Sequence, residues 1–289
     1  MQRRSTLLSV VAVAGIDPES EGIALATQLG IPTTVSGVEG LIAMPEFGDI
    51  TIVFDATTAA AHPSNAAKLA PYEKQLIGLT PAAMGPYIVP AVNLDQHLDA
   101  PYVSMVTCGG QSTVPIIAAI SRVTPVHYGE IVTTIASEPS GPGARAHIGE
   151  LTNTASAAIE AVGGAALGKA IIVVNSADRQ LIMRDTVRCL TDPMDDEKRA
   201  RLNSSIEEMV AAVAAYIPGY RLKQQVQIWT VAVDEPFVGR SGELSPGEYD
   251  EVSVFLQVQD APASLPGYVD MMTSAARVVA ERMALGSSL

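Results

Sequence analysis

The fold is decided by one stretch of the sequence, Val103-Ser104-Met105-Val106-Thr107-Cys108-Gly109-Gly110-Gln111-Ser112-Thr113-Val114-Pro115. An apolar, β-branched run ends at a thiol, and two glycines lead into an apolar segment, residues 115–123, that predicts a helix. Cys108 is therefore expected where a strand gives way to a helix N-terminus. Unpaired amides and the positive end of the helix dipole gather there and lower the pKa of a thiol. Cys108 is predicted to be either a nucleophile or a small buried apolar residue.

The composition indicates a globular protein with a large core. Of 289 residues, 48% are hydrophobic and 17% are charged, which is not the composition of a disordered chain. The net charge of −13 argues against nucleic-acid binding, which needs clustered Lys and Arg. Two cysteines, Cys108 and Cys189, are too few for a disulfide framework, so we expect a cytoplasmic protein. We expect no membrane span, because no apolar run approaches about 20 residues.

The N-terminal residues fit two interpretations. Basic residues precede an apolar run over residues 7–14, and Ala12-Val13-Ala14 is typical of a signal-peptide cleavage site. The alternative, which we favour, is a buried strand over residues 10–16, because an acidic turn follows directly.

The first third of the chain alternates short apolar strands with helices, which predicts a doubly wound parallel sheet of the Rossmann type. We expect strands at residues 10–16, 50–54, 76–79, 88–92 and 103–106, and helices at 21–29 and 62–70. Asp17, after the first strand, stands where such a fold keeps the acid that bonds a ribose hydroxyl. It is equally an ordinary turn residue.

The rest of the chain predicts a mixed α+β domain. We expect strands at residues 126–136, 170–174, 222–233 and 252–258, helices at 151–161, 206–216 and 271–283, and a surface loop at the acidic segment 192–197. No metal site is expected, because the four histidines make no metal-ligand spacing with the cysteines.

A series of short motifs, in matching order and spacing from about Gly15 to the last helix, resembles one family. The motifs are Gly15-Ile16-Asp17-Pro18-Glu19-Ser20, Val53-Phe54-Asp55-Ala56-Thr57, Leu79-Thr80-Pro81-Ala82-Ala83, Met105-Val106-Thr107-Cys108-Gly109-Gly110-Gln111, Ser140-Gly141-Pro142-Gly143-Ala144-Arg145, Gly163-Gly164-Ala165-Ala166, Met183-Arg184-Asp185-Thr186, Tyr216-Ile217-Pro218-Gly219-Tyr220-Arg221-Leu222 and Met272-Thr273-Ser274-Ala275-Ala276. Together they resemble the CoA-dependent acylating acetaldehyde dehydrogenases, which pair with a 4-hydroxy-2-oxovalerate-type aldolase in bacterial degradation of aromatics and sterols.

The resemblance implies an activity: NAD-dependent oxidation of acetaldehyde or propanal to the acyl-CoA, through a thiohemiacetal and a thioester. It implies that Cys108 is the nucleophile and Asp185 the general base. From the residues alone, Asp185 would instead be interpreted as an ion pair with Arg184 or a helix cap. NAD is the implied cofactor and coenzyme A the co-substrate. Contacts with the dinucleotide are expected at Asp17, Pro139, Ser140, Gly141, Pro142, Gly143, Ala144, Arg145, Ala146, His147 and Tyr268.

The resemblance also implies the organisation of the molecule. Residues 1–107 would form the NAD-binding Rossmann-type domain, on which a C-terminal helix, 268–289, packs. Residues 108–267 would form the α+β catalytic and dimerisation domain. The implied partner is the aldolase, with a homodimer of this chain inside a heterotetramer, and we expect no nucleic acid or membrane partner.

The chain departs from the family at its start. The family opens with a strand and a glycine-rich turn that binds the dinucleotide pyrophosphate, whereas the residues before Gly15 contain no glycine. We therefore expect the first βα unit to be missing. Three explanations stay open: a misassigned start codon, a decayed inactive copy, or repacking of residues 7–14. Pro139 and Tyr268 depart too, because the family usually has serine and asparagine there.

Two other functions remain as alternatives. One is a catalytically silent partner subunit that supports the aldolase. The other is a thiol enzyme of the semialdehyde dehydrogenase type, in which the cysteine normally pairs with a histidine and the enzyme takes phosphate or a phosphorylated acid.

Overall fold

The computed structural model describes residues 5–136, 148–175, 183–234, 237–238, 243–258 and 267–286. The chain divides into two compact units. The first unit comprises residues 1–86, 97–104 and 276–289, and the second comprises residues 87–96 and 105–275. The predicted domain limits, 1–107 and 108–267 with a returning helix at 268–289, stay a prediction.

The first unit begins with a βαβ element. Strand β1 (Val13–Ala14) pairs in parallel with β2 (Thr33–Thr34), and α1 (Glu21–Gln28) connects them. The predicted strand over residues 10–16 is therefore only two residues long, and Gly15 continues beside it through a hydrogen bond from its N–H to Thr34 O (2.9 Å).

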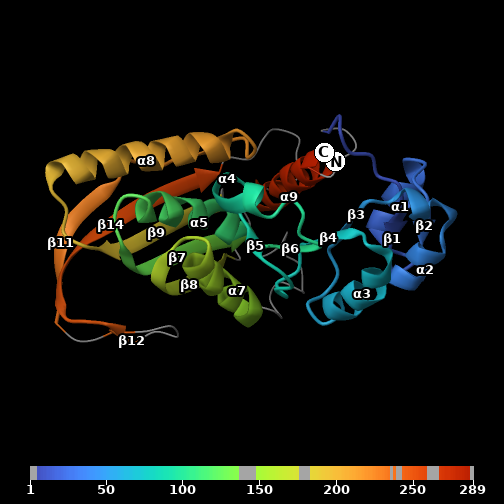
Figure 1. Ribbon diagram of the computed structural model, residues 1–289, viewed down its shortest axis with the longest axis horizontal. Coiled ribbons are helices and arrows are strands. Elements are labelled where there is room, and N and C mark those ends of the chain that lie inside the picture. The colour runs from blue at the N-terminus through green and yellow to red at the C-terminus, as the bar shows by residue number, and fades with distance from the viewer. Residues whose placement is uncertain are drawn as a thin grey trace. The chain divides into compact units, whose positions relative to one another are not determined.

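Parallel strands alternate with helices in the rest of this unit, as predicted (Figure 1). After α2 (Gly37–Ala43) and a 3₁₀ turn, η1 (Pro45–Asp49), come β3 (Ile52–Asp55), α3 (His62–Leu69), η2 (Ala70–Tyr72), β4 (Gln75–Gly78) and β6 (Tyr102–Met105). Strands β3, β4 and β6 lie side by side in that order, all parallel.

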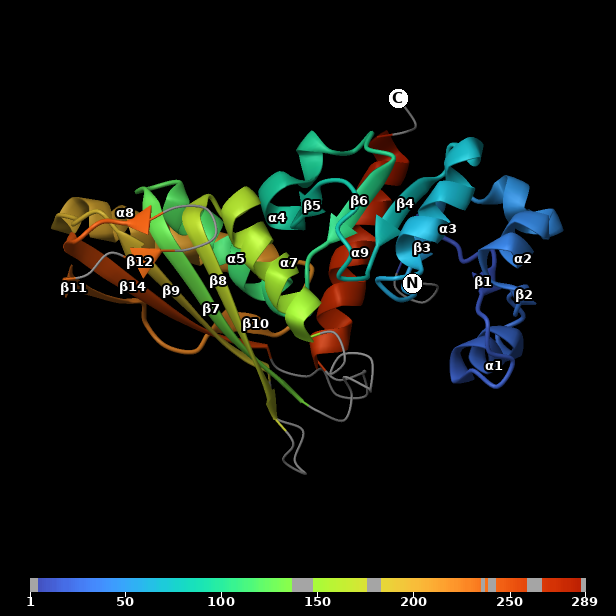
Figure 2. The same ribbon diagram turned by 90° about the horizontal axis from the view of Figure 1, so that it is seen from below.

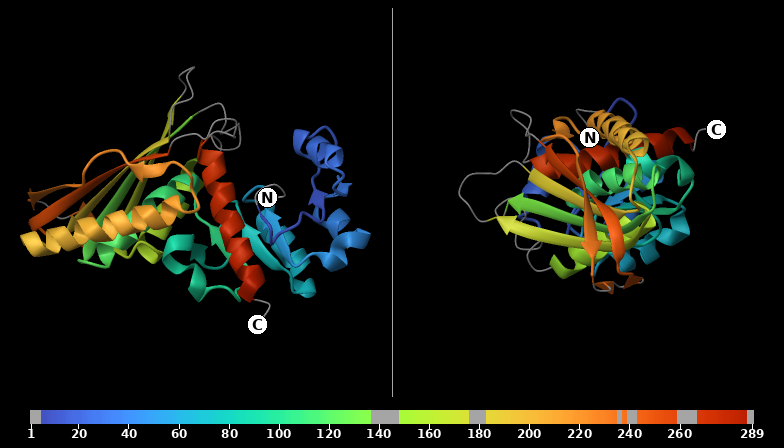
Figure 3. Two further views of the ribbon diagram at one scale, coloured as in Figure 1. Left: turned by 90° about the horizontal axis from the view of Figure 1, so that it is seen from above. Right: turned by 90° about the vertical axis from the view of Figure 1, so that its left-hand side faces the viewer.

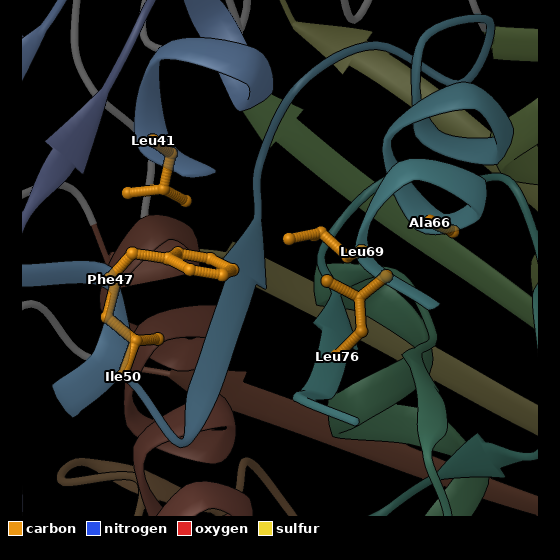
Figure 4. Close-up of a cluster of buried hydrophobic side chains, with 6 residues drawn as sticks. All are labelled: Leu41, Phe47, Ile50, Ala66, Leu69 and Leu76. Atoms are coloured by element: carbon orange, nitrogen blue, oxygen red, sulfur yellow. The ribbon is translucent and has the colours of Figure 1, made fainter. Parts of the chain in front are cut away.

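An apolar cluster between α2, η1, α3 and β4 forms a core of this unit (Figure 4). Its buried members are Leu41, Phe47, Ile50, Ala66, Leu69 and Leu76. Tyr72 closes the cluster with its ring edge-on to Phe47, 5.0 Å between centroids. Aromatic pairs prefer this arrangement over face-to-face stacking.

One predicted strand of the second unit is wrong. Residues 88–92 were expected to be extended, but β5 (Tyr87–Ile88) ends at once and α4 (Pro90–Asn93) begins, followed by η3 (Leu94–Gln96). Pro90 stands at the first helical position, where its fixed φ favours a helix. Asn93 completes the turn, because its Oδ1 accepts from Val89 N–H (3.0 Å) and its Nδ2 donates to Tyr87 O (2.8 Å).

The second unit is built on a six-stranded mixed sheet. The strands run in the order β10 (Tyr220–Leu222), β14 (Gly247–Val258), β9 (Met183–Thr191), β7 (Val126–Ala136) and β8 (Ala165–Asn175), and β11 (Gln227–Val233) also pairs with β14. Only β7 and β8 are parallel; the other pairs are antiparallel. The strands fan out along the sheet (Figure 3). A two-stranded hairpin, β12 (Phe237–Val238) and β13 (Glu243–Leu244), lies apart from this sheet.

Helices cover one face of this sheet. Helix α5 (Cys108–Ser121) contacts β7 and β9, α7 (Ile148–Ala161) contacts β8, and α8 (Asp196–Ala214) lies along α5 (Figure 2). Residues alternate along each strand, so Val187 and Val254 are buried beneath the helices. On the opposite face Val173 and Trp229 are 43% and 40% exposed. The last helix is α9 (Gly267–Gly286).

Three other expectations need correction. The predicted strand over 222–233 is two strands, β10 and β11, and β9 was not predicted at all. The acidic segment 192–197, expected as a surface loop, includes the start of α8. Asp195 explains why α8 begins inside this acidic segment, because its side chain accepts from Lys198 N–H (2.8 Å) and caps the helix. Within the described ranges, no helix is both long and apolar enough to cross a membrane.

Candidate active site

Cys108 lies at a strand-to-helix junction, as the sequence predicts. Strand β6 ends at Met105 and α5 begins at Cys108 itself. Thr107 caps the helix, because its Oγ1 accepts from Gly110 N–H (2.9 Å). The first turn of α5 is thereby fixed around the thiol.

The two glycines after Cys108 are required by close packing. A Cβ on Gly109 would lie 2.5 Å from Thr133 Oγ1, and a Cβ on Gly110 would lie 2.4 Å from Val106 Cγ1. Both distances are shorter than a Cβ tolerates, so glycine at 109 lets α5 approach β7 this closely and glycine at 110 leaves room for Val106.

The predicted lowering of the Cys108 pKa is wrong for this structure. Burial raises the pKa of the thiol to about 12, its own backbone N–H opposes that rise in part, and the charge of Asp185 adds to it. Desolvation therefore outweighs the helix N-terminus. The thiol is protonated at neutral pH, and its chemistry needs a base.

Asp185 is the residue that the resemblance implies as that base. It lies on β9, between Thr133 of β7 and Leu256 of β14, and is 1% exposed. Burial raises the pKa of its carboxyl to about 7, and the nearby hydroxyls of Ser112 and Thr133 offset part of the rise. The carboxyl points to the helix-covered face, whereas Arg184 lies exposed on the other face, so Asp185 is no helix cap and its orientation does not favour an ion pair with Arg184.

Polar groups that the sequence did not single out surround Asp185. Ser112 donates a short hydrogen bond from Oγ to Asp185 Oδ2, and Tyr220 donates from Oη to Ser112 O (2.5 Å). Ser112 is one helical turn after Cys108, which is the signal that would have found it. Among the described residues, Asp185 Oδ1 and Thr133 Oγ1 have no hydrogen-bond partner of normal geometry.

Gln111 ties the start of α5 to β5. Its Nε2 donates to Ile88 O (2.7 Å), and the side chain is fully buried. Its Oε1 lacks a hydrogen-bond partner within the described structure. The residue therefore fixes the helix and leaves one acceptor available in its first turn.

The predicted dinucleotide contacts are only partly described. Asp17 is exposed after β1, and its Oδ1 accepts from Glu19 N–H (2.9 Å), which closes a turn and leaves the carboxylate open to solvent. The expected bond of Asp17 to a ribose hydroxyl stays a prediction. Residues 139–147 lie outside the described residues, and Tyr268 falls where only the backbone of α9 is described.

Two of the histidines pair with aspartates. His62 Nδ1 lies 2.9 Å from Asp55 Oδ2 inside the first unit, and His127 Nε2 lies 2.7 Å from Asp192 Oδ1. Cys189 is buried in the core face of β9, where burial raises its pKa. Across the part of the chain that the structure describes, no cluster of His, Cys, Asp and Glu has the makings of a metal site.

Comparison with known proteins identifies the family. Residues 108–266 match a family model described as prokaryotic acetaldehyde dehydrogenase, dimerisation. Acetaldehyde dehydrogenase 3 of Nocardia farcinica is 56% identical, over 98% of this chain and 87% of that protein. Acetaldehyde dehydrogenase 1 of a Nocardioides species is 54% identical, over 99% of this chain and 92% of that protein.

A solved structure supports the fold class. Aspartate semialdehyde dehydrogenase II of Vibrio cholerae superposes with a TM-score of 0.53 at 10% identity, over 93% of this chain and 97% of that chain. At such low identity the likeness shows the fold alone. The predicted class, a Rossmann-type sheet with an α+β domain, is confirmed.

The expected loss of the family's first βα unit is not borne out. Nearly the whole chain aligns with these relatives, and its N-terminal residues form their own βαβ element from β1, α1 and β2. The identity of more than 50% extends over both units. The chain belongs to the acetaldehyde dehydrogenase family.

Proposed function

We propose that this protein oxidises acetaldehyde or propanal to the acyl-CoA with NAD⁺, through a covalent acyl intermediate on Cys108. The observation that carries the proposal is the combination of a partly exposed Cys108 at the start of α5 with a buried Asp185 on β9. The charge of Asp185 acts on the Cys108 thiol and raises its pKa, which supports this pairing. Family membership supports the same chemistry.

The two pKa values fit a thiol and its base. A thiol with a pKa of about 12 is a weak nucleophile until a base removes its proton, whereas a carboxyl with a pKa of about 7 is partly ionised at neutral pH. A base with a pKa near the working pH transfers protons most effectively. Asp185 takes the thiol proton while sulfur forms its bond to the aldehyde carbon.

The second proton transfer uses the same carboxyl. Asp185 returns the thiol proton to the former aldehyde oxygen, so the thiohemiacetal on Cys108 carries a hydroxyl and the carboxylate is ionised again. As the carbonyl of the thioester forms, this hydroxyl gives its proton to Asp185, which then releases it to solvent. Bound NAD⁺ would supply the hydride acceptor. Finally, the thiol of coenzyme A gives up its proton and attacks the thioester, and the Cys108 sulfur leaves and takes up a proton.

The cofactor contacts are part of the proposal. Asp17 would bond a ribose hydroxyl of NAD⁺, and residues 139–147 with Tyr268 would line the rest of the dinucleotide site. The exposed carboxylate after β1 supports the first contact.

Steady-state kinetics on the purified full chain test the activity. We expect NADH to form from acetaldehyde and NAD⁺ with dependence on coenzyme A, and Cys108→Ala to abolish this turnover. Cys189→Ala is the matched control, because it removes the other thiol outside the site. Dependence on phosphate instead of coenzyme A would contradict the proposal and favour the semialdehyde dehydrogenase type.

We propose further that the chain forms a homodimer and binds a 4-hydroxy-2-oxovalerate-type aldolase. Residues 108–266 match a family model that is described as a dimerisation region. Val173 and Trp229, which are exposed on the helix-free face of the sheet, support a contact there. Co-purification of the chain with such an aldolase tests the second partner, and an unrelated enzyme that should not co-purify is the control. Two free cysteines support a reducing compartment, the cytoplasm.

A further inference from the structure

Ser112 stands between two acceptors. Its Oγ lies 3.0 Å from Gly109 O and makes a short contact with Asp185 Oδ2. The side chain is fully buried. A hydroxyl has a single proton, so it donates to one of these oxygens at a time.

We infer that Ser112 is a positioning residue whose hydroxyl turns between Gly109 O and Asp185 as that carboxyl gains and loses a proton. The inference rests on the proposed function, in which Asp185 is the base and passes through both protonation states in every turnover.

When Asp185 is ionised, the groups around Ser112 keep their hydrogen bonds. Ser112 then donates to Asp185 Oδ2, and a buried carboxylate needs such a donor. Gly109 O gives up the serine proton but still accepts from Thr113 Oγ1 (2.6 Å). No group is left unpaired by the change.

When Asp185 is protonated, its carboxyl and Ser112 stay hydrogen-bonded as well. Asp185 Oδ2–H donates to Ser112 Oγ, and Ser112 turns its own proton to Gly109 O at 3.0 Å. The hydroxyl thus acts as an acceptor in one state and as the donor to the carboxyl in the other. Both states of the base are supported without moving a heavy atom.

A hydrogen bond to its backbone also fixes the position of Ser112. Tyr220 Oη donates to Ser112 O at 2.5 Å, so β10 holds the backbone of α5 at this residue. The titratable groups near Asp185 are Cys108 on α5 and Tyr220 on β10. Strands β7 and β14 place Thr133 and Leu256 opposite it, and neither titrates.

The test is the pH profile of Ser112→Ala in the full chain. Without the serine hydroxyl the Asp185 carboxylate loses a hydrogen-bond donor, so its pKa rises. The acid limb of the profile, where kcat/KM falls as the pH is lowered, therefore moves to higher pH by about one unit. At any pH on this limb, kcat/KM is then roughly tenfold lower than in the unaltered chain. The rate at high pH stays within about threefold, because Asp185 is still present. An unmoved acid limb overturns the inference.

Ser121→Ala is the matched control. Ser121 lies on the same helix and donates from Oγ to Gly163 O (2.6 Å), away from Asp185. We expect its pH profile to match that of the unaltered chain. An equal shift in both variants would mean that any hydroxyl lost from α5 has this effect, and would overturn the inference.

Infrared titration separates this inference from the proposed function. The protonated carboxyl of Asp185 is identified as the band that Asp185→Asn removes, and Ser112→Ala is expected to raise its titration midpoint. If Asp185→Asn retains full activity, the base assignment fails while a raised midpoint still supports the contact. If the midpoint does not move, Ser112 does not act on Asp185 and the inference fails alone.

Discussion

The buried carboxyl of Asp185 lowers the free energy of unfolding at neutral and higher pH, so replacing it should stabilise the protein. Its pKa is raised to about 7 in the fold, against about 4 in an unfolded chain. Above pH 7 the folded state holds a buried charge that the unfolded state solvates freely, so the residue destabilises the fold. This cost shrinks as the pH falls from 7 to 4, and below 4 both states are protonated.

Asp185→Asn is therefore expected to lose activity and gain stability. Turnover should fall about 10²- to 10⁴-fold, the usual contribution of a general base. The free energy of unfolding at pH 8 should rise by roughly 2–4 kcal/mol, as measured by urea denaturation. A gain that persists unchanged at pH 4 would contradict the assigned protonation.

Gly109 is the residue that brings the catalytic turn against β7. In Gly109→Ala the new Cβ would meet Thr133 Oγ1 at 2.5 Å and Cγ2 at 2.6 Å. We expect a loss of about 1–3 kcal/mol in stability, seen in thermal unfolding, together with loss of turnover. Thr133→Ala should restore part of it, because two of the three close contacts disappear.

Gly149→Ala serves as the control for this substitution. Gly149 lies on α7, and a Cβ there has nothing within 4 Å. Alanine is expected to leave the stability unchanged or raise it by about 0.5–1 kcal/mol, because it favours the helix. Equal losses in the two variants would contradict the packing argument.

At the scale of elements, Asp250 joins β14, β11 and α8. It is fully buried, accepts from Arg199 Nη2 (2.9 Å) and Met194 N–H (3.0 Å) through Oδ2, and accepts from Thr230 Oγ1 (2.8 Å) through Oδ1. Desolvation disfavours its charge, but these donors outweigh it and hold the pKa of Asp250 below its usual range. The stability it contributes is present above about pH 4 and is lost as the pH falls through the lowered pKa.

Asp250→Ala should destabilise the protein by about 3–5 kcal/mol, because Arg199 loses its buried partner. Chemical denaturation at pH 7 measures the loss. The comparison is Lys68→Ala, which breaks the exposed pair of Lys68 with Glu39 (2.8 Å) and should lower the stability far less, because solvent screens an exposed pair. A small effect at Asp250 would mean that α8 is held by its apolar face alone.

The elements show where sequence patterns suffice. Continuous apolar runs predicted β3, β4 and β6, and the thiol followed by two glycines predicted that Cys108 lies where a strand gives way to a helix. The helix itself was expected only over residues 115–123, whereas α5 already begins at Cys108. Strand β9 was missed, because Arg184, Asp185 and Arg188 interrupt its apolar alternation. Asp185 is buried there only because Ser112, 73 residues away in sequence, supplies a donor, and such a long-range pair leaves no local signal.

The site shows the same limit. Cys108 was visible from its own neighbours, whereas Asp185 was identified by resemblance alone. Tyr220 and Ser112 meet across 108 positions, so only the register of β10, β14 and β9 brings them together. The direction of the Cys108 pKa was mispredicted for a related reason: the helix end is local, but the burial that outweighs it comes from the whole unit.

At the scale of the whole molecule, the open face of the second unit's sheet is the expected dimer contact. Trp229 is 40% exposed there, and large aromatic residues dominate the energy of interfaces. We expect Trp229→Glu to weaken self-association at least about tenfold, measured by light scattering after size-exclusion chromatography. Leu25→Glu, on exposed α1 of the first unit, should leave the oligomeric state unchanged; equal effects would contradict this face.

The most direct test of the account is to stop the reaction before coenzyme A takes the acyl group. The purified chain is mixed with acetaldehyde and NAD⁺ alone, quenched in acid, digested and analysed by mass spectrometry. The account predicts one burst of NADH and the mass of one acetyl group on the peptide that contains Cys108, with none on the peptide that contains Cys189. An unmodified Cys108 peptide after an NADH burst would contradict a covalent intermediate on this thiol.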